Sequence, residues 1–156
     1  MMILSTTDQP ALLKWAALRC AGPGFQFSQN AEALGVLEED TGRIVAVMVV
    51  DGTFYDAALV HFASNGSKIW CSHRILAGLF GYLFVYKRLA RVIGMTPADN
   101  VAALKMVLMM GFQIEGRMRS TISGEADIVS MMFAEECRWI KQELEHSDGQ
   151  EISTAT

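Results

Sequence analysis

The sequence has few charged residues and few prolines. Charged residues make up 19% of the 156 residues and proline occurs three times, whereas an average protein is about 25% charged. Hydrophobic residues reach 51%, which excludes intrinsic disorder over most of the length. A chain of this length usually forms one domain. We therefore expect a single domain over residues 1–146, followed by a flexible polar tail over residues 147–156.

A long hydrophobic run is also absent. The longest nearly apolar stretch covers residues 75–86, and a helix needs about 20 residues to cross a bilayer. The first ten residues contain neither the basic region nor the apolar stretch of a signal peptide. These absences predict a cytoplasmic protein that does not enter a membrane.

Cysteine and histidine are scarce. Three of each occur, without CxxC, HxxxH or HExxH spacing, so the sequence predicts neither a disulfide framework nor a metal site. The net charge of −4 gives no general electrostatic surface for nucleic acid. A local basic cluster at Lys87, Arg88 and Arg91 is more typical of a solvated face, so we do not expect a nucleic-acid partner.

Hydrophobic periodicity and turn residues predict the secondary structure. Helices are expected over residues 8–20, from 70 or 72 to 86, 100–110 and 134–146; strands are expected over residues 31–38, 43–50, 55–63, 91–95, 112–119 and 127–133. Hairpins come first and a strand–helix–strand crossover follows. This order predicts a mixed α/β fold with a central, mostly antiparallel sheet flanked by helices.

One motif is more specific than this order of elements. Asn100 is followed after ten residues by Gly111-Phe112, and then by Glu115-Gly116 and Arg119. This pattern resembles the GNAT superfamily of acyl-CoA-dependent N-acyltransferases. It looks like the branch that acetylates ribosomal-protein N-termini, and like short acyltransferase-like proteins encoded by phages and prophages. The resemblance implies a GNAT-like sheet in which two parallel strands splay apart.

The resemblance also implies a site for acetyl-CoA. The pantetheine arm would lie between strands 55–63 and 91–95, and the pyrophosphate would lie at the start of the following helix, where N–H groups converge. A backbone N–H near Phe62 or Ala63 would polarise the thioester. The cofactor-binding residues expected in this way are Phe62, Ala63, Lys68, Ile69, Trp70, Cys71, Ser72, His73, Arg74 and Asn100.

The predicted pyrophosphate loop departs from the pattern of the family. The usual motif is Q/R-x-x-G-x-G/A, and here Ser67, Trp70 and Ser72 stand at its three defined positions. Tryptophan cannot adopt the positive φ that glycine allows without strain. Either the loop follows a wider path with Trp70 beside the cofactor, or CoA binding is weakened or lost. Nearby positive charge on Lys68, His73 and Arg74 favours retained binding.

Two residues are candidate catalytic groups. Asp56, eleven residues before Ser67, has the spacing of the basic glutamate of histone-acetylating relatives and could accept the proton of an amine. Asn100 could cap a helix and also hydrogen-bond to the pantetheine or acyl group. The tyrosine that many relatives carry seven residues later is replaced by Val107. His61 alternates with Asp56, and we interpret it as a core or interface histidine.

These features lead to one main hypothesis and one rival. The main hypothesis is an N-acetyltransferase that moves acetyl from acetyl-CoA to a primary amine on a protein N-terminus, a lysine or a small molecule. The rival is a non-catalytic structural or interaction module with the GNAT fold. The high apolar content, together with the apolar segment of residues 78–86, also predicts a homodimer.

Overall fold

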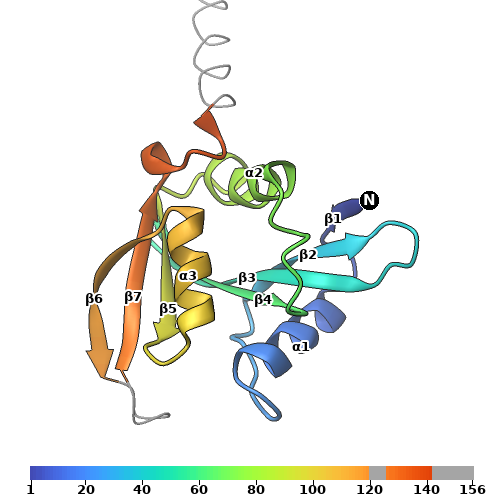
Figure 1. Cartoon of the computed structure of the whole chain (residues 1–156), viewed down its shortest axis with the longest axis horizontal. Coiled ribbons are helices and arrows are strands. Elements are labelled where there is room, and N and C mark those ends of the chain that lie inside the picture. Colours follow the sequence, from blue (N-terminus) through green and yellow to red (C-terminus); the bar gives the residue numbers. More distant parts are fainter. Residues whose placement is uncertain (120–125, 142–156) are drawn as a thin grey trace, which may run out of the picture.

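A computed structural model of the chain describes residues 1–119 and 126–141, and it contains a seven-stranded sheet (Figure 1). The strands follow the order β1-β2-β3-β4-β5-β7-β6. The elements are β1 (Met2–Ser5), α1 (Gln9–Cys20), β2 (Glu32–Glu38), β3 (Ile44–Phe54), β4 (Ala57–Ser64), α2 (His73–Gly81), the π-helical turn η1 (Tyr82–Tyr86), β5 (Arg91–Pro97), α3 (Val101–Met110), β6 (Gln113–Arg119), β7 (Ala126–Phe133) and the 3-10 turn η2 (Ala134–Glu136).

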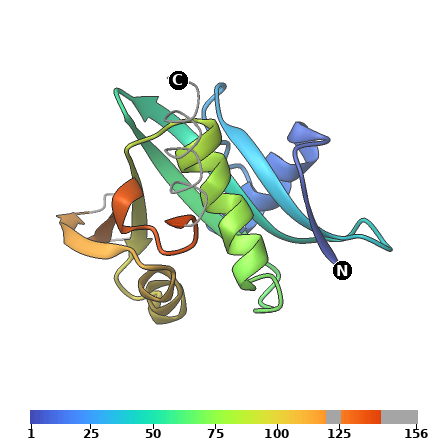
Figure 2. The same cartoon turned by 90° about the horizontal axis from the view of Figure 1, so that it is seen from above.

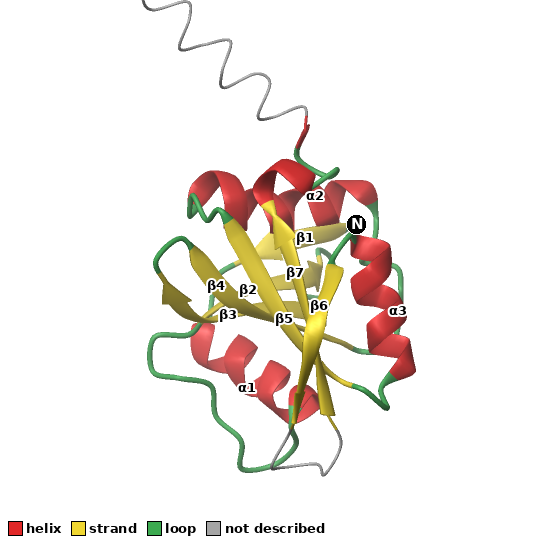
Figure 3. Ribbon diagram, turned by 90° about the vertical axis from the view of Figure 1, so that its left-hand side faces the viewer, coloured by secondary structure: helices red, strands yellow, loops and turns green. Residues whose placement is uncertain are grey.

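Helices cover both faces of the sheet. α1 packs against β2, β3 and β4 on one face, and α2 lies on the other, as Figures 2 and 3 show from two directions. Two separate apolar clusters follow from this layering: one includes Leu12 and Ala16 of α1, and the other includes Leu76 and Phe80 of α2. Residues 45–50 of β3 are buried on both sides, which explains why their sequence is continuously apolar rather than alternating.

One strand pair differs from all the others. The neighbouring strands of the described sheet pair antiparallel except for β4 and β5, which are parallel and joined by the α2 crossover. Their pairing runs only from Ala57 with Arg91 to Leu59 with Ile93, and beyond these residues the strands separate. The predicted fold, including the splayed parallel pair, is therefore confirmed.

Side-chain caps fix the ends of the two helices next to this pair. The Ser72 hydroxyl accepts a hydrogen bond from Ile75 N–H at 3.3 Å and begins α2. The Asn100 side-chain oxygen accepts from Ala103 N–H at 3.2 Å and begins α3. Gly111 ends α3 with φ of 108°, a conformation that glycine adopts without a Cβ penalty. Both predicted helix starts thus have a physical cause.

The ends of the chain differ most from the sequence prediction. β1 was not expected, because four residues between the N-terminus and a helix carry too little periodicity. The helix expected over residues 134–146 does not begin at Ala134: a 3-10 turn is followed by extended Cys137. The Trp139 indole then donates to the Met110 carbonyl at 2.8 Å, so this segment closes the end of α3. The tail over residues 147–156 and the turn near Gly124 lie outside the described residues.

The described residues lack two features that would point to particular functions, a membrane-spanning helix and a cluster of metal ligands. None of the helices there has the length and apolar character needed to cross a membrane. In the same part of the chain, no three His, Cys, Asp or Glu side chains gather in a way that could hold a metal ion.

Candidate active site

A cleft of about 190 Å³ lies where β4 and β5 separate. Residues 60–62 of β4 and 94–97 of β5 form its walls. Arg19 and Cys20 line it from the end of α1, and Met106 and Val107 line it from α3. Because α1 lies on one face of the sheet and α3 packs with the α2 cluster on the other, the lining combines side chains from both faces. Two reactants could therefore approach the same point from opposite sides.

Main-chain groups of Phe62 point into this cleft. Asn65 N–H donates to the Val45 carbonyl at 2.9 Å, in register with the pairing of Ala63 and Val47. In an antiparallel pair the hydrogen-bonded residues alternate, so Ala63 directs its N–H and C=O towards β3 and Phe62 directs them away. Since β4 has no pairing with β5 beyond Leu59, the Phe62 groups face the cleft. The geometry thus separates the two predicted N–H donors and favours Phe62.

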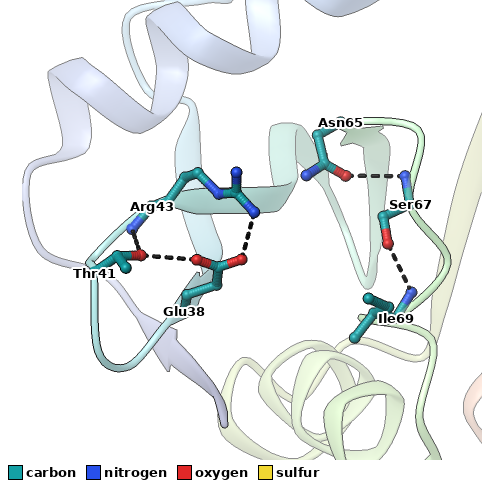
Figure 4. A network of polar contacts seen from close by, with 6 residues as sticks. All are labelled: Glu38, Thr41, Arg43, Asn65, Ser67 and Ile69. Carbon is teal, nitrogen blue, oxygen red and sulfur yellow. Dashed lines mark hydrogen bonds and ion pairs between the residues drawn. The ribbon is translucent and has the colours of Figure 1, made fainter.

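The loop between β4 and α2 is held by its own short polar contacts. Ser67 N–H donates to the Asn65 side chain at 2.9 Å, and Ile69 N–H donates to the Ser67 hydroxyl at 3.2 Å (Figure 4). Cys71 N–H donates to the Lys68 carbonyl at 3.0 Å. The N–H groups at Lys68, Trp70, Ser72, His73 and Arg74 have no partner among the described residues. These groups remain available for an anion at the start of α2.

Trp70, which stands where the family pattern has glycine, is accommodated without a positive φ. No residue from Ser67 to Ser72 has a positive φ, so the loop does not need the conformation that only glycine adopts easily. The indole is 1% exposed and packs in the apolar cluster of α2, with no partner for its N–H among the described residues. Trp70 therefore anchors the loop to the core.

The three predicted cations of this loop have different surroundings. Arg74 donates to the Met2 carbonyl of β1, and the His73 ring lies 5.4 Å from the Trp139 ring. Lys68 makes no side-chain hydrogen bond or ion pair to the described residues. Burial raises the pKa of the neighbouring Cys71 thiol, so that group stays protonated and is a poor nucleophile. Among these side chains, Lys68 is the one without a polar contact to the described residues, and Arg74 also keeps its charge because its partner is a neutral carbonyl.

Asp56 lies at the wrong end of β4 for the expected role. It occupies the turn before the strand, its side chain is 62% exposed, and its carboxylate is 3.9 Å from the Arg91 guanidinium. Its carbonyl accepts from Ala90 N–H at 2.8 Å, beside the paired ends of β4 and β5. The cleft opens only after Leu59. The structure does not bring Asp56 to the cleft, because a base there must follow the point where the strands separate.

Asn100 combines two roles in one position. Its side-chain oxygen caps α3, and the residue also lines the cleft. The amide nitrogen, which the cap does not use, can donate to a group in the cleft. Val107 lines the same cleft seven residues later, so the position that carries tyrosine in many relatives offers no proton donor here.

His61 is the titratable group of β4 that the structure does place at the cleft. It follows the last paired residue of β4 by two positions and lines the cleft on the α1 face. Its ring lies 5.3 Å from the Phe27 ring. Burial lowers the pKa of His61, and the Asp51 carboxylate opposes this shift. The imidazole is therefore neutral near pH 7 and can accept a proton. In the sequence, alternation along the strand places His61 on the face opposite Asp56, and we interpreted it there as a core or interface histidine.

Comparisons with known proteins give matches in structure but not in sequence. No family model and no curated protein sequence matches the chain. A mutant of the spermidine N-acetyltransferase SpeG from Vibrio cholerae aligns with a TM-score of 0.73 at 10% identity, over 91% of this chain and 98% of that protein. The ribosomal-protein-S18-alanine N-acetyltransferase from Escherichia coli aligns with a TM-score of 0.62 at 16% identity, over 85% and 94%. A GNAT-family acetyltransferase from Bacillus anthracis aligns with a TM-score of 0.57 at 15% identity, over 67% of each chain.

These similarities identify the architecture. The seven-stranded, mostly antiparallel sheet with a splayed parallel pair is the fold of the GNAT acetyltransferases. The expected resemblance to that superfamily, including its ribosomal-protein acetyltransferases, is confirmed at the level of the fold.

Proposed function

We propose that this protein is an N-acetyltransferase that transfers an acetyl group from acetyl-CoA to a primary amine. The observation that carries the proposal is the cleft between β4 and β5, which combines unpaired main-chain groups with access from both faces of the sheet. Unpaired backbone N–H and C=O groups in a sheet require partners. The amide groups of a pantetheine arm would supply them as an added strand does.

Acetyl-CoA would supply the acetyl group as a thioester. The free N–H groups at Ser72 and His73, at the start of α2, would bind the pyrophosphate, with Lys68 adding positive charge. Main-chain groups of Phe62 would hold the arm and polarise the carbonyl. The Asn100 amide would add a further donor from α3. These residues fit the cofactor although the loop lacks the usual glycines.

His61 is the group that would accept the proton of the acceptor amine. The amine nitrogen forms the new C–N bond as the C–S bond breaks, the electron pair of that bond stays on sulfur, and the imidazole takes the proton that the nitrogen loses. Because His61 lies on the α1 face and α2 lies on the other, the acceptor would approach from the side opposite the pyrophosphate. This assignment replaces Asp56.

Binding of acetyl-CoA and release of free CoA thiol test the proposal. At 100 times the dissociation constant, acetyl-CoA should add about 2.7 kcal/mol to the free energy of unfolding. With a primary amine present, thiol should appear at the rate at which amide forms. If millimolar acetyl-CoA leaves the melting temperature unchanged, the transfer reaction is excluded, and the rival hypothesis of a non-catalytic module takes its place.

We also propose that the protein works as a homodimer in the cytoplasm. Tyr86 and Val85 of η1 are exposed, and the Tyr82 and Tyr86 rings stack 5.3 Å apart. Exposed aromatic groups of this kind are common at interfaces between proteins. Light scattering at micromolar concentration should give about twice the chain mass of 17.2 kDa, and Tyr86→Asp should return the mass of one chain.

A further inference from the structure

A second and larger hollow lies on the α1 face. It measures about 1000 Å³ and is bounded by α1 and by residues 24–32, the segment that leads into β2. We call it the α1 hollow. Its apolar lining includes Pro10, Leu13, Ala17, Leu18, Phe25 and Phe27. Leu18 is 47% exposed and Phe25 is 40% exposed. A concave surface with exposed apolar side chains is typical of a ligand site.

The α1 hollow adjoins the proposed proton acceptor. Phe27 lines the hollow, and its ring lies 5.3 Å from the His61 ring, which lines the cleft between β4 and β5. Phe25 contacts Phe27 edge to face, with ring centres 5.1 Å apart. The segment is fixed by Ser28, whose N–H donates to the Asp51 carboxylate at 3.1 Å. The Phe27 ring thus separates the α1 hollow from the His61 side chain.

The charges around the α1 hollow limit what can bind there. Lys14 and Glu32 are the titratable side chains among its lining residues. The Glu32 Oε2 atom accepts hydrogen bonds from Lys87 at 2.6 Å and from Tyr82 at 2.9 Å, and the ion pair with Lys87 lowers the pKa of Glu32. Lys14 adds a positive charge. Because Lys87 neutralises Glu32 and Lys14 is positive, the lining carries no net negative charge that would attract a second ammonium group.

We propose that the α1 hollow holds the body of the acceptor, and that the acceptor is a primary amine with a single amino group on an apolar aryl or alkyl body. This inference rests on the proposed function, because acyl transfer is the reason for placing an amine beside His61. The apolar lining favours such a body. The absence of net negative charge in the lining disfavours a polyamine. A small aryl amine and a peptide with an apolar first residue share this chemistry.

Three acceptors distinguish these chemistries: 2-phenylethylamine, the peptide Phe-Ala-Ala-amide and spermidine. We expect kcat/KM for spermidine to be at least tenfold lower than for the better of the other two. A small amine as the better substrate identifies a free metabolite as the source, and the peptide as the better substrate identifies a protein N-terminus. A preference for spermidine over both would overturn the inference.

A pair of matched variants tests the site itself. Leu18→Asp puts a charge on the rim of the α1 hollow, and Leu108→Asp changes a leucine of similar exposure (49%) on α3. We expect Leu18→Asp to raise KM for the preferred acceptor about tenfold with little change in kcat, and Leu108→Asp to leave both near their original values. Equal effects of the two variants would contradict the inference.

Binding without acetyl-CoA separates this inference from the proposed function. Calorimetric titration of 2-phenylethylamine and Phe-Ala-Ala-amide should show binding of one or both that Leu18→Asp weakens and Leu108→Asp does not. If this holds but no amine is acetylated, the transfer reaction fails while the apolar amine site stands. If amines are acetylated but Leu18→Asp binds them normally, the transfer reaction stands and the assignment of the α1 hollow fails.

Discussion

The two ends of β4 both lie beside β3, but only one of them also pairs with β5. Ala57 and Ala58 pair with both β3 and β5, Leu59 pairs with β5 opposite an irregularity in β3, and from Val60 to Ser64 the strand pairs with β3 alone. The paired end satisfies its backbone groups within the sheet. The open end leaves groups that face a cleft. The difference shows that strand pairing decides where a ligand can add to this sheet.

The same comparison separates two titratable side chains. Asp56 precedes the paired end, lies in solvent and contacts Arg91. His61 lies at the open end, between the cleft and Phe27, in a setting that lowers its pKa. A carboxylate at the correct spacing in the sequence is thus less suited to the chemistry than a histidine five residues later. For access to the cleft, the position of a residue relative to the point where β4 and β5 separate matters more than its type.

The largest effect on stability is expected at Trp70, in the loop that follows the open end of β4. Trp70→Ala removes a fully buried indole that joins the loop to the α2 cluster, and it should lower the free energy of unfolding by about 3–5 kcal/mol. Urea denaturation measures this loss. Trp70→Phe keeps most of the apolar volume and removes an N–H without a partner, so its loss should be clearly smaller. Equal losses would contradict the conclusion that the buried aromatic volume of Trp70 anchors the loop.

Catalysis should respond oppositely at the two ends of β4. His61→Asn removes the proton acceptor at the open end and should lower kcat by about 100-fold. Asp56→Asn changes the paired end and should keep kcat within about twofold. Both can be measured by following thiol release at saturating acetyl-CoA. A large loss for Asp56→Asn together with normal activity of His61→Asn would reverse the assignment.

Asn100 should show separable effects on stability and on binding. Asn100→Ala removes the cap of α3 and should cost about 1 kcal/mol of unfolding free energy. Asn100→Asp keeps a capping oxygen and should preserve stability, but it loses the amide donor at the cleft. We expect a weaker affinity for acetyl-CoA in both variants, measured by calorimetry. Unchanged affinity in both would limit Asn100 to the role of a cap.

The smallest effect concerns the dependence of stability on pH. Burial holds the pKa of folded His61 below the ordinary value of 6.5, so the unfolded chain binds more protons there than the folded chain between the two values. Stability from this group is present above pH 6.5 and is lost as the pH falls through the lowered pKa. The difference in unfolding free energy between the original chain and His61→Asn should change in that window. A constant difference would mean that His61 titrates normally.

The sequence could predict the elements but not the exact place where two strands separate. Turn residues, caps and the Asn100 to Arg119 motif identify most helices and strands, because these signals are local. The point of separation depends on where β5 leaves β4, a contact between segments more than 30 residues apart. The spacing to Ser67 led to Asp56 as the base, and the sequence did not show that this residue precedes the point of separation. Burial of Trp70 also required knowledge of the α2 cluster. The expected start of the final helix at Ala134 was wrong, because residues 134–136 form a 3-10 turn and Cys137 is extended.

The amide signal of Phe62 tests the central claim most directly. The open end of β4 should receive acetyl-CoA, with the Phe62 N–H facing the cleft and the Ala63 N–H bonded towards β3. In ¹H–¹⁵N spectra titrated with acetyl-CoA, Phe62 should shift strongly and exchange more slowly with solvent, while Ala58 at the paired end should change little. Saturating acetyl-CoA that leaves Phe62 unchanged, or that shifts Ala58 more than Phe62, would contradict the account.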